Sequence, residues 1–397
     1  MHALAILHPQ LATSCPRVHA KRLASLMAAV DAAVSGSCLS LSELGRGLRG
    51  RVAVKHNIKR IDRLLGNGAL HAEIPGLYES LLRRCLAGVQ TPLIIIDWSD
   101  LTPDRRWQLL RASVALAGRS VTLYEQVHPL SRATSPRVHA RFLTRIKAML
   151  PNGCTPILIT DAGFRSRWFT LVNRMGWQWI GRIRNRDMIK RLGGDAWQGC
   201  KALYTQATGT AQTLGQYEYV RSNPVTCRWV IIKRRGLGRH KRGVHGQRVR
   251  SNQSLKHTRA NREPWLLAVS PGLVHLGAQG VVAVYAQRMQ IEEAFRDLKS
   301  ERFGLGLSAS RSKHKDRLSV LLLIACLASF VLRLIGQAAK HRQMEFQFQS
   351  NTRRSRPVLS VISLGLQLVQ KNLASFPRHE LNAALERLRS CHPALGI

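Results

Sequence analysis

The chain has 397 residues, 45% of them hydrophobic and 21% charged, so it has room for two or three domains with a sizeable core. Its charge is unusual, because 61 Lys and Arg face only 22 Asp and Glu, which gives a net charge of +39. Such an excess repels itself unless a polyanion offsets it, and nucleic acid is the usual one. A membrane surface is disfavoured as a partner, because no isolated basic amphipathic tail is present.

The eight cysteines form no CxxC pair and no cluster. This spacing argues against a disulfide framework and a structural zinc site, and it fits a reducing cytoplasm. The N-terminus lacks a basic start followed by a long apolar run, so we expect no signal peptide. The apolar run Leu318–Leu332 is short for a bilayer span of about 20 residues, so we interpret it as a buried helix.

Three short helices are predicted near the N-terminus. The first covers residues 17–34, and the second follows at Leu39–Arg46, where a serine with Glu43 forms a capping pattern. The third, 55–65, has an apolar face and a basic face that includes Lys59, Arg60 and Arg63. Three short helices with a basic final one suggest a small DNA-binding unit.

An α/β pattern follows a predicted linker at 68–76 and a helix at Leu77–Leu86. The run Pro92–Asp100 reads as a buried strand running into an acidic end, and two further β-rich runs are split by Gly118 as in a hairpin. A helix at Pro136–Leu150 precedes a second apolar strand that ends in Asp161. Another helix (165–175) and strand (177–184) complete the pattern, which indicates a mixed sheet.

Residues 185–262 interrupt this pattern with short β-like runs and a strongly basic stretch, Lys233–Arg250, which contains eight Lys or Arg and no acid. We interpret the segment as an insertion whose basic stretch binds phosphates. The residue pattern of a β-strand returns at Trp265.

The run Tyr285–Lys299 has no Pro or Gly and is rich in helix formers, so it predicts one continuous helix. At about 100° per residue, four of its side chains share one face. These are Tyr285, Arg288, Glu292 and Lys299. A carboxylate with two cations and an aromatic ring on one stripe suits a surface that holds a metal ion beside a phosphate backbone.

Asp97 and Asp161 are each predicted at the C-terminal end of an apolar strand, where open α/β sheets place their sites. Together with Glu292 they form a set of three carboxylates. Such a set is favourable only with divalent cations, and its hard oxygen ligands suit Mg²⁺, with Mn²⁺ as a substitute. Two such ions can support an in-line phosphoryl displacement.

These residues resemble a family. The spacing Tyr-x2-Arg-x3-Glu-x6-Lys at Tyr285, Arg288, Glu292 and Lys299 is similar to the signature of bacterial cut-and-paste insertion-sequence transposases of the DDE class, the IS-four group. The resemblance implies that Asp97, Asp161 and Glu292 bind two metal ions. It implies DNA contacts for Tyr285, Arg288 and Lys299, and base stacking for Trp265.

The resemblance also implies an architecture: an α/β, RNase H-like core with a mostly β insertion between helical flanks. We expect a helical DNA-binding region at 1–75, the first part of the core at 76–184, the insertion at 185–262, the last strand and catalytic helix at 263–336, and a helical C-terminal region at 337–397 that supports dimerisation. The expected protein is a bacterial cytoplasmic, nucleoid-associated homodimer acting on transposon ends and target DNA, with no membrane partner.

The function expected from the sequence is transposition: binding of terminal inverted repeats, end cleavage through hairpins, and joining to target DNA. Two alternatives stay open at this point. One is an RNase H-like, metal-dependent DNA nuclease without strand transfer, and the other is a non-catalytic DNA-binding protein.

Overall fold

The computed structural model describes residues 2–36, 38–184, 187–234, 247, 251–252, 263–353, 356–390 and 392. Its contacts divide the chain into two compact units. The larger unit comprises Met1–Cys154 and Met289–Ala394, and the smaller unit comprises Thr155–Arg288. Most of the basic stretch Lys233–Arg250 lies outside the described residues.

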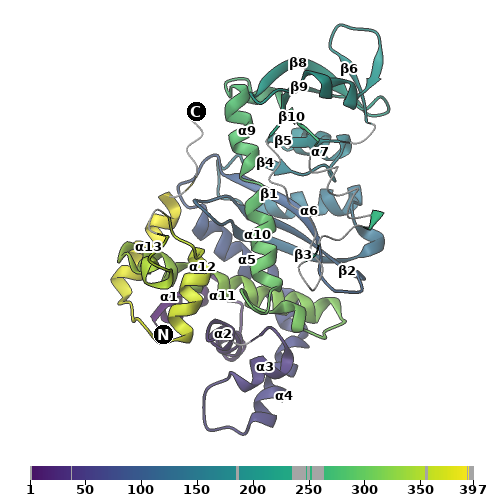
Figure 1. Ribbon diagram of the computed structural model, residues 1–397. Coiled ribbons are helices and arrows are strands. Elements are labelled where there is room, and N and C mark those ends of the chain that lie inside the picture. Colours follow the sequence, from purple (N-terminus) through teal and green to yellow (C-terminus); the bar gives the residue numbers. More distant parts are fainter. Residues whose placement is uncertain are drawn as a thin grey trace. The chain divides into compact units, whose positions relative to one another are not determined.

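The larger unit contains most of the helices (Figure 1). Its elements are α1 (His2–Ser14), α2 (Ala20–Val34), α3 (Leu41–Arg46), α4 (Val54–Leu65), α5 (Gly68–Cys85), β1 (Leu93–Asp100), β2 (Trp107–Val114), β3 (Val121–Pro129), α6 (Pro136–Met149), α10 (Met289–Lys299), α11 (Lys315–His341), α12 (Val361–Gln370) and α13 (Arg378–Ser390). Short 3-10 helices lie at Leu130–Arg132, Leu307–Ala309 and Met344–Phe348.

The N-terminal helices largely follow the sequence prediction. The helices predicted at 17–34 and 55–65 are α2 and α4, and α3 begins where the Ser40 hydroxyl accepts a hydrogen bond from the Glu43 backbone N–H at 3.3 Å. The predicted linker at 68–76 is wrong, because α5 starts at Gly68 and continues through Pro75. The Asn67 side chain caps it by accepting from Leu70 N at 2.8 Å. A stripe of buried side chains, including Leu70, outweighs the low helix propensity of glycine and proline.

Helix α11 is the core of the larger unit. It is 27 residues long, and by length and composition it is the one helix among the described residues that is apolar enough to cross a membrane. In the most apolar window, however, 89% of the residues are buried inside the protein. Helices α1, α2, α5, α12 and α13 pack around it. The run Leu318–Leu332 is therefore a buried core helix, as the sequence analysis predicted.

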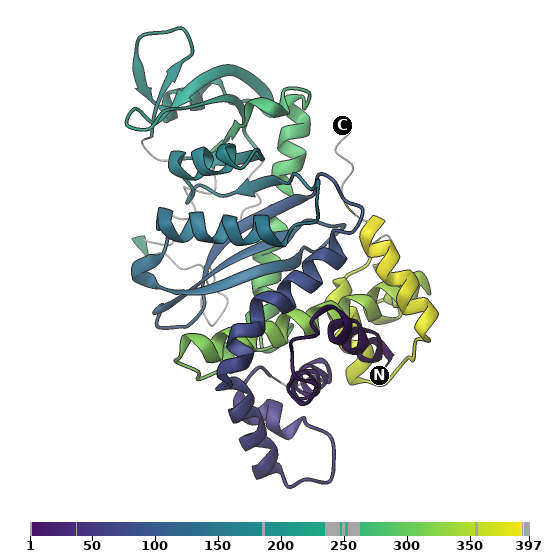
Figure 2. The ribbon, with the colours of Figure 1, turned by 180° about the vertical axis from the view of Figure 1, so that it is seen from behind.

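The three strands of the larger unit form an antiparallel sheet in the order β3-β2-β1. Gly118, with a φ of 93°, makes the predicted turn between β2 and β3, a backbone conformation that favours glycine. Trp98 of β1 donates from its indole Nε1 to His139 of α6 at 3.1 Å, whereas the next residue, Ser99, accepts from Lys299 of α10 at 2.7 Å. Because neighbouring strand residues point to opposite faces, α6 and α10 cover opposite faces of this sheet (Figures 1 and 2).

The smaller unit is a mixed sheet with helices on both faces. Its elements are β4 (Ile157–Thr160), α7 (Ser166–Arg174), β5 (Gln178–Ile183), β6 (Met188–Arg191), β7 (Trp197–Gly199), β8 (Gln212–Tyr219), β9 (Val225–Ile232), β10 (Trp265–Val269) and α9 (Ala278–Ala286), with 3-10 helices at Cys200–Gln206 and Pro271–Leu273. The strand order is β4-β5-β10-β9-β8-β6-β7, with β4 and β5 parallel and the other pairs antiparallel.

The segment 185–262 does contribute β structure, and its strands extend the same sheet through the β9–β10 pair. The two faces of β5 meet different helices. Phe169 of α7 stacks on Trp179 with ring centroids 3.9 Å apart, and a Cβ on Gly181 would come within 2.4 Å of that ring. Arg182 points to the opposite face, where the charge of its guanidinium acts on Tyr285 of α9.

Candidate active site

Strand β1 holds Asp97 in a buried position. Asp97 was expected at the C-terminal end of an apolar strand, but β1 continues past it to Asp100, because pairing with β2 extends from Ile94–Val114 to Asp100–Gln108. Asp97 is 8% exposed, and one of its carboxylate oxygens accepts a hydrogen bond from the Trp98 backbone N–H at 2.8 Å. Asp97 is thus fixed in mid-strand, where its side chain has less freedom than at a strand end.

The predicted single helix Tyr285–Lys299 is wrong. The chain forms α9, which ends at Ala286, and α10, which begins at Met289. Between them, the backbone N–H groups of Gln287 and Arg288 donate to the carbonyls three residues earlier, at 3.1 and 3.0 Å. An α-helix would bond the carbonyls four residues earlier, so the chain forms a 3-10-like turn here. The break needs neither Gly nor Pro, so composition did not reveal it. The signature residues are therefore divided, with Tyr285 and Arg288 in the smaller unit and Glu292 and Lys299 on α10.

Helix α10 lies along β1 with its chain direction parallel to the strand. At its N-terminal end, the Gln290 side-chain amide bonds both the N–H and the C=O of Leu116, whose neighbour Ala115 pairs with Leu93 at the start of β1. At its C-terminal end, the Lys299 amine reaches Ser99 near the end of β1. Ser99 and Asp97 point to the same face of the strand, which is the face that α10 covers. Glu292 stands in the first turn of α10 and is exposed.

The pKa of the Lys299 amine is lowered, first by burial and then by the positive charge of Arg111, while Asp100 opposes the shift. The amine also lies 5.6 Å from the centre of the Phe295 ring. A partly buried ammonium beside Asp97's strand is a suitable donor for a phosphate oxygen, because a desolvated charge interacts more strongly than a hydrated one.

Arg111 is a residue that the sequence reasoning missed. It pairs in register with Asp97 on one side and with Glu125 on the other, so the three side chains form a row on the face of the sheet that α10 covers. The guanidinium bonds the Glu125 carboxylate at 2.7 Å and lies over the Phe295 ring, 4.8 Å from its centre. The Tyr78 hydroxyl donates to the second Glu125 oxygen at 2.7 Å. The available signal was that Arg111 is the one charged residue of β2, Trp107–Val114.

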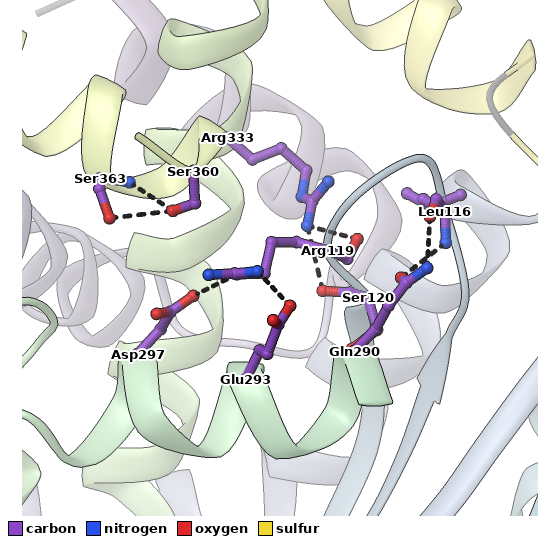
Figure 3. A network of polar contacts seen from close by, with 9 residues as sticks. All are labelled: Leu116, Arg119, Ser120, Gln290, Glu293, Asp297, Arg333, Ser360 and Ser363. Carbon is purple, nitrogen blue, oxygen red and sulfur yellow. Dashed lines mark hydrogen bonds and ion pairs between the residues drawn. The ribbon is translucent and has the colours of Figure 1, made fainter. Parts of the chain in front are cut away.

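A second ion-pair cluster fixes the other side of α10 (Figure 3). Arg119, next to the β2–β3 turn, binds Glu293 and donates to Asp297 at 3.0 Å. Arg333 of α11 in turn donates to the carbonyls of Arg119 and Ser120 at 2.7 and 3.1 Å. Glu293 is thus a structural acid of α10, on the side turned toward the hairpin.

In the smaller unit, Asp161 directly follows β4, as predicted. One of its carboxylate oxygens accepts from the Gly163 backbone N–H at 2.8 Å, which is a turn that orients the side chain at the strand end. Asp161 is half-buried. Burial is the main cause that raises the pKa of the nearby Tyr285 hydroxyl, and the negative charge of Asp161 raises it further.

Tyr285, Arg288 and Trp265 form a second group in the smaller unit. The Trp265 and Tyr285 rings meet edge to face with centroids 4.9 Å apart, and the Arg288 guanidinium lies 6.0 Å from the Tyr285 ring. Burial raises the pKa of the Tyr285 hydroxyl to about 12, so it is a neutral hydrogen-bond donor at pH 7. Arg234 covers the Trp265 ring at 4.5 Å. Trp265 is therefore a partner of the signature tyrosine as well as the first residue of β10.

The basic face of α4 is exposed. Lys59, Arg60 and Arg63 point outward, and within the described part of the chain none of them takes part in an ion pair. Their neighbour Asp62 pairs with Arg317 at the start of α11 at 2.7 Å, which anchors α4 to the core helix. The three cations are therefore available to a partner.

The proposed metal ligands offer only carboxylate oxygens, which is the chemistry that hard divalent cations prefer. Within either unit taken alone, the described residues contain no group of three or more His, Cys, Asp or Glu suited to a metal ion. Burial raises the pKa of the Cys85 thiol to about 12 and also raises that of Cys227, so these thiols are protonated and poor ligands for a soft metal. The acids at 97, 161 and 292 fit Mg²⁺ or Mn²⁺ by donor type.

Residues 89–331 match the family model of the transposase DDE domain. This range covers more than half of the chain and includes β1, β4 and α10. The mixed α/β architecture is consistent with an RNase H-like core of such a domain. No curated protein with which the chain was compared matches it.

Proposed function

Because the chain belongs to the transposase DDE domain family, we propose that it binds the terminal inverted repeats of a mobile element, cuts the ends and joins their 3′ ends to target DNA. The observation that carries this proposal is that the matched range contains Asp97, Asp161 and Glu292 together with the complete signature of Tyr285, Arg288, Glu292 and Lys299. The excess of 39 positive charges supports a polyanionic substrate.

In this proposal Asp97, Asp161 and Glu292 hold Mg²⁺ or Mn²⁺, two ions per site. When bound, such ions activate a water or a 3′-hydroxyl and stabilise the leaving oxygen of an in-line displacement. End cleavage, hairpin formation, hairpin opening and strand joining use the same site, because each is the same displacement with a different nucleophile. Asp97 is suited to its role because strand pairing and the Trp98 N–H fix its carboxylate before any ligand arrives.

The remaining signature residues position the DNA. Lys299, held beside β1 by Ser99, contacts a phosphate near the cleaved bond. Tyr285 and Arg288 contact further phosphates of the same strand, and Trp265 stacks on an extruded base, an interaction worth about 1–3 kcal/mol. Lys59, Arg60 and Arg63 of α4 bind the duplex of the terminal repeat, and two copies of the chain pair the two ends.

The test uses linear DNA that carries the inverted repeats flanking the gene, with and without Mg²⁺. We expect cleaved ends and hairpins only with the metal. Asp97→Asn, Asp161→Asn and Glu292→Gln should each abolish cleavage while DNA binding persists. The matched control is Glu386→Gln, an exposed acid of α13 whose side chain is 66% exposed, and it should cleave like the wild type.

Two outcomes would replace the proposal. If pre-cut ends are not joined to target DNA although cleavage proceeds, the protein is a metal-dependent nuclease. If the wild type cleaves no end with or without Mg²⁺ and the three carboxamide variants bind DNA as it does, the protein acts only by binding DNA.

A further inference from the structure

The larger unit contains a cavity of about 680 Å³ that plays no part in the proposed cleavage site. It lies between α5, the edge strand β3, the first two turns of α6 and the start of α11. None of the proposed metal ligands or signature residues is in its lining. A cavity of this volume matches a small-molecule site or a short piece of one nucleic-acid strand, and it is too small to admit a whole duplex.

Cations outnumber carboxylates in the wall of this cavity, which also contains apolar side chains. Arg132, Arg137, Arg141 and Lys315 all line it and are exposed, and none of them forms an ion pair with any residue that the structure describes. They come from three different elements: the turn after β3, helix α6 and helix α11. Four like charges around one hollow repel each other, so an anion in the hollow would stabilise the arrangement.

The acids in the lining do not balance these cations. Glu125 is held by Arg111 and Tyr78 inside the core, so its charge is already offset. Asp316 is the other lining carboxylate among the described residues. His128 contributes no charge near neutral pH, because burial and the nearby Lys315 ammonium lower its pKa to about 4. The cavity is therefore cationic at pH 7.

The cavity also adjoins the basic helix α4 within the same unit. Arg317, two residues after Lys315 on α11, pairs with Asp62 of α4. His71 of α5, which lines the cavity, bonds the carbonyl of Leu65 at the end of α4 at 2.9 Å. The exposed cations of α4 and those of the cavity thus lie on connected elements.

We propose that this cavity binds the phosphodiester backbone of one DNA strand, continuing the DNA-binding surface of α4. Arg137 and Arg141, one turn apart on α6, are the central contacts, and Arg132 and Lys315 hold the strand at the two sides. Guanidinium groups suit this role, because their donors match phosphate oxygens in pairs. The identity of the ligand as DNA rests on the proposed function, whereas the anion site rests on the cavity itself.

The test measures how salt weakens the binding of a short DNA duplex without inverted repeats, by fluorescence anisotropy. The double variant R137A/R141A should bind about tenfold more weakly at low salt, and the slope of log affinity against log salt should fall by about 2, since each phosphate contact contributes about 0.9. The charge-keeping variant R137K/R141K should keep the wild-type salt slope and lose less affinity than R137A/R141A, because lysine keeps the charge but not the paired donors.

The matched control is R167A/R174A, which removes two exposed arginines from the amphipathic helix α7 and leaves the cavity intact. It loses the same net charge, so it corrects for the general attraction of a basic protein to DNA. Melting temperatures of all variants, measured alongside, should match the wild type, because the four arginines are exposed. If R137A/R141A and R167A/R174A give equal affinities and slopes, the proposal is wrong.

Competition identifies the source of the phosphate. If the cavity serves DNA, inorganic phosphate and adenosine monophosphate at millimolar concentration should displace the duplex only weakly. If either one binds the wild type tightly and R137A/R141A loses that binding while keeping control-level DNA affinity, the cavity is a site for free phosphates and the DNA assignment is overturned. End cleavage is scored in parallel. Normal binding and cleavage by R137A/R141A would show that the cavity is not a DNA-binding site. Cleavage by the Asp97→Asn variant would instead contradict the proposed function.

Discussion

Arg111 and Glu125 form an ion pair in the interior of the larger unit, with side chains only 4% and 1% exposed and a closest distance of 2.7 Å. They face each other across the β2–β3 pair, and Asp97 is the next residue in the same row on β1. Arg111 also packs over Phe295, three residues after Glu292 on α10. The pair thus connects the strand of one proposed catalytic acid with the helix of another.

Glu125→Ala should destabilise the protein by about 3–5 kcal/mol, because it leaves the buried Arg111 guanidinium without its counter-charge. Urea unfolding monitored by circular dichroism measures the change. The exposed pair Arg389–Glu386 supplies the comparison, and Glu386→Ala should cost less than about 1 kcal/mol. Similar losses of unfolding free energy in the two variants would mean that the buried Arg111–Glu125 pair stabilises the protein no more than an exposed pair does.

Gly336→Ala should destabilise the protein by about 1–3 kcal/mol, because α11 and α12 approach each other at glycines. A Cβ on Gly336 would lie 1.9 Å from the Val361 carbonyl oxygen, so the helices would have to separate. Gly280→Ala in α9 is the control: its nearest neighbours would be Leu276 atoms at 3.8 Å or more, and we expect a gain of about 0.5–1 kcal/mol. Thermal unfolding of both variants decides the point, and an unchanged melting temperature for Gly336→Ala would contradict it.

Stability should fall as the pH is lowered from 6.5 toward 4, in part because of His139. Burial is the first cause that lowers the pKa of His139 from 6.5 to about 4, and its Nε2 accepts the Trp98 indole N–H, so it needs to be neutral in the folded state. The unfolded chain takes up a proton at higher pH than the folded chain, so this contribution is complete above 6.5 and is lost as the pH falls through that window. His128 shifts in the same direction. Unfolding free energies at pH 7.5, 6 and 5 measure the slope, and His139→Gln should be less stable at pH 7.5 but show a smaller slope. An equal slope in that variant would assign the pH dependence to other groups.

Arg119→Ala should lower both stability and end cleavage, because Arg119 neutralises Glu293 and Asp297 on the helix that carries Glu292. Asp297 is buried and burial raises its pKa, so losing Arg119 leaves a poorly compensated carboxyl group and costs about 3 kcal/mol. Arg342→Ala, which breaks the more exposed pair with Glu380, is the matched control and should leave cleavage unchanged. Cleavage is compared below both melting temperatures, and wild-type cleavage by Arg119→Ala would show that this cluster does not position α10.

Several elements were predictable because their signal is local. The apolar and basic faces of α4, the Ser40 cap of α3, the strand before Asp161 and the Gly118 turn are each encoded within a few neighbouring residues. The three acids and the signature lysine could be selected in the same way, because their spacing and strand context are properties of the sequence alone. That they act as metal ligands and DNA contacts stays a prediction.

Other features depended on contacts between distant segments. The helix through Pro75 exists because a buried stripe outweighs local propensity, and the break between α9 and α10 carries no Gly or Pro to mark it. Arg111 and Glu125 are 14 residues apart, and only the register of β2 on β3 brings them face to face. The cationic cavity needs four elements spread from α5 to α11. The sequence alone determined the positive charge, the local elements and the set of acids. The tertiary structure decided which charges are buried in pairs and which remain open to a ligand, because burial and pairing arise only when distant segments pack together.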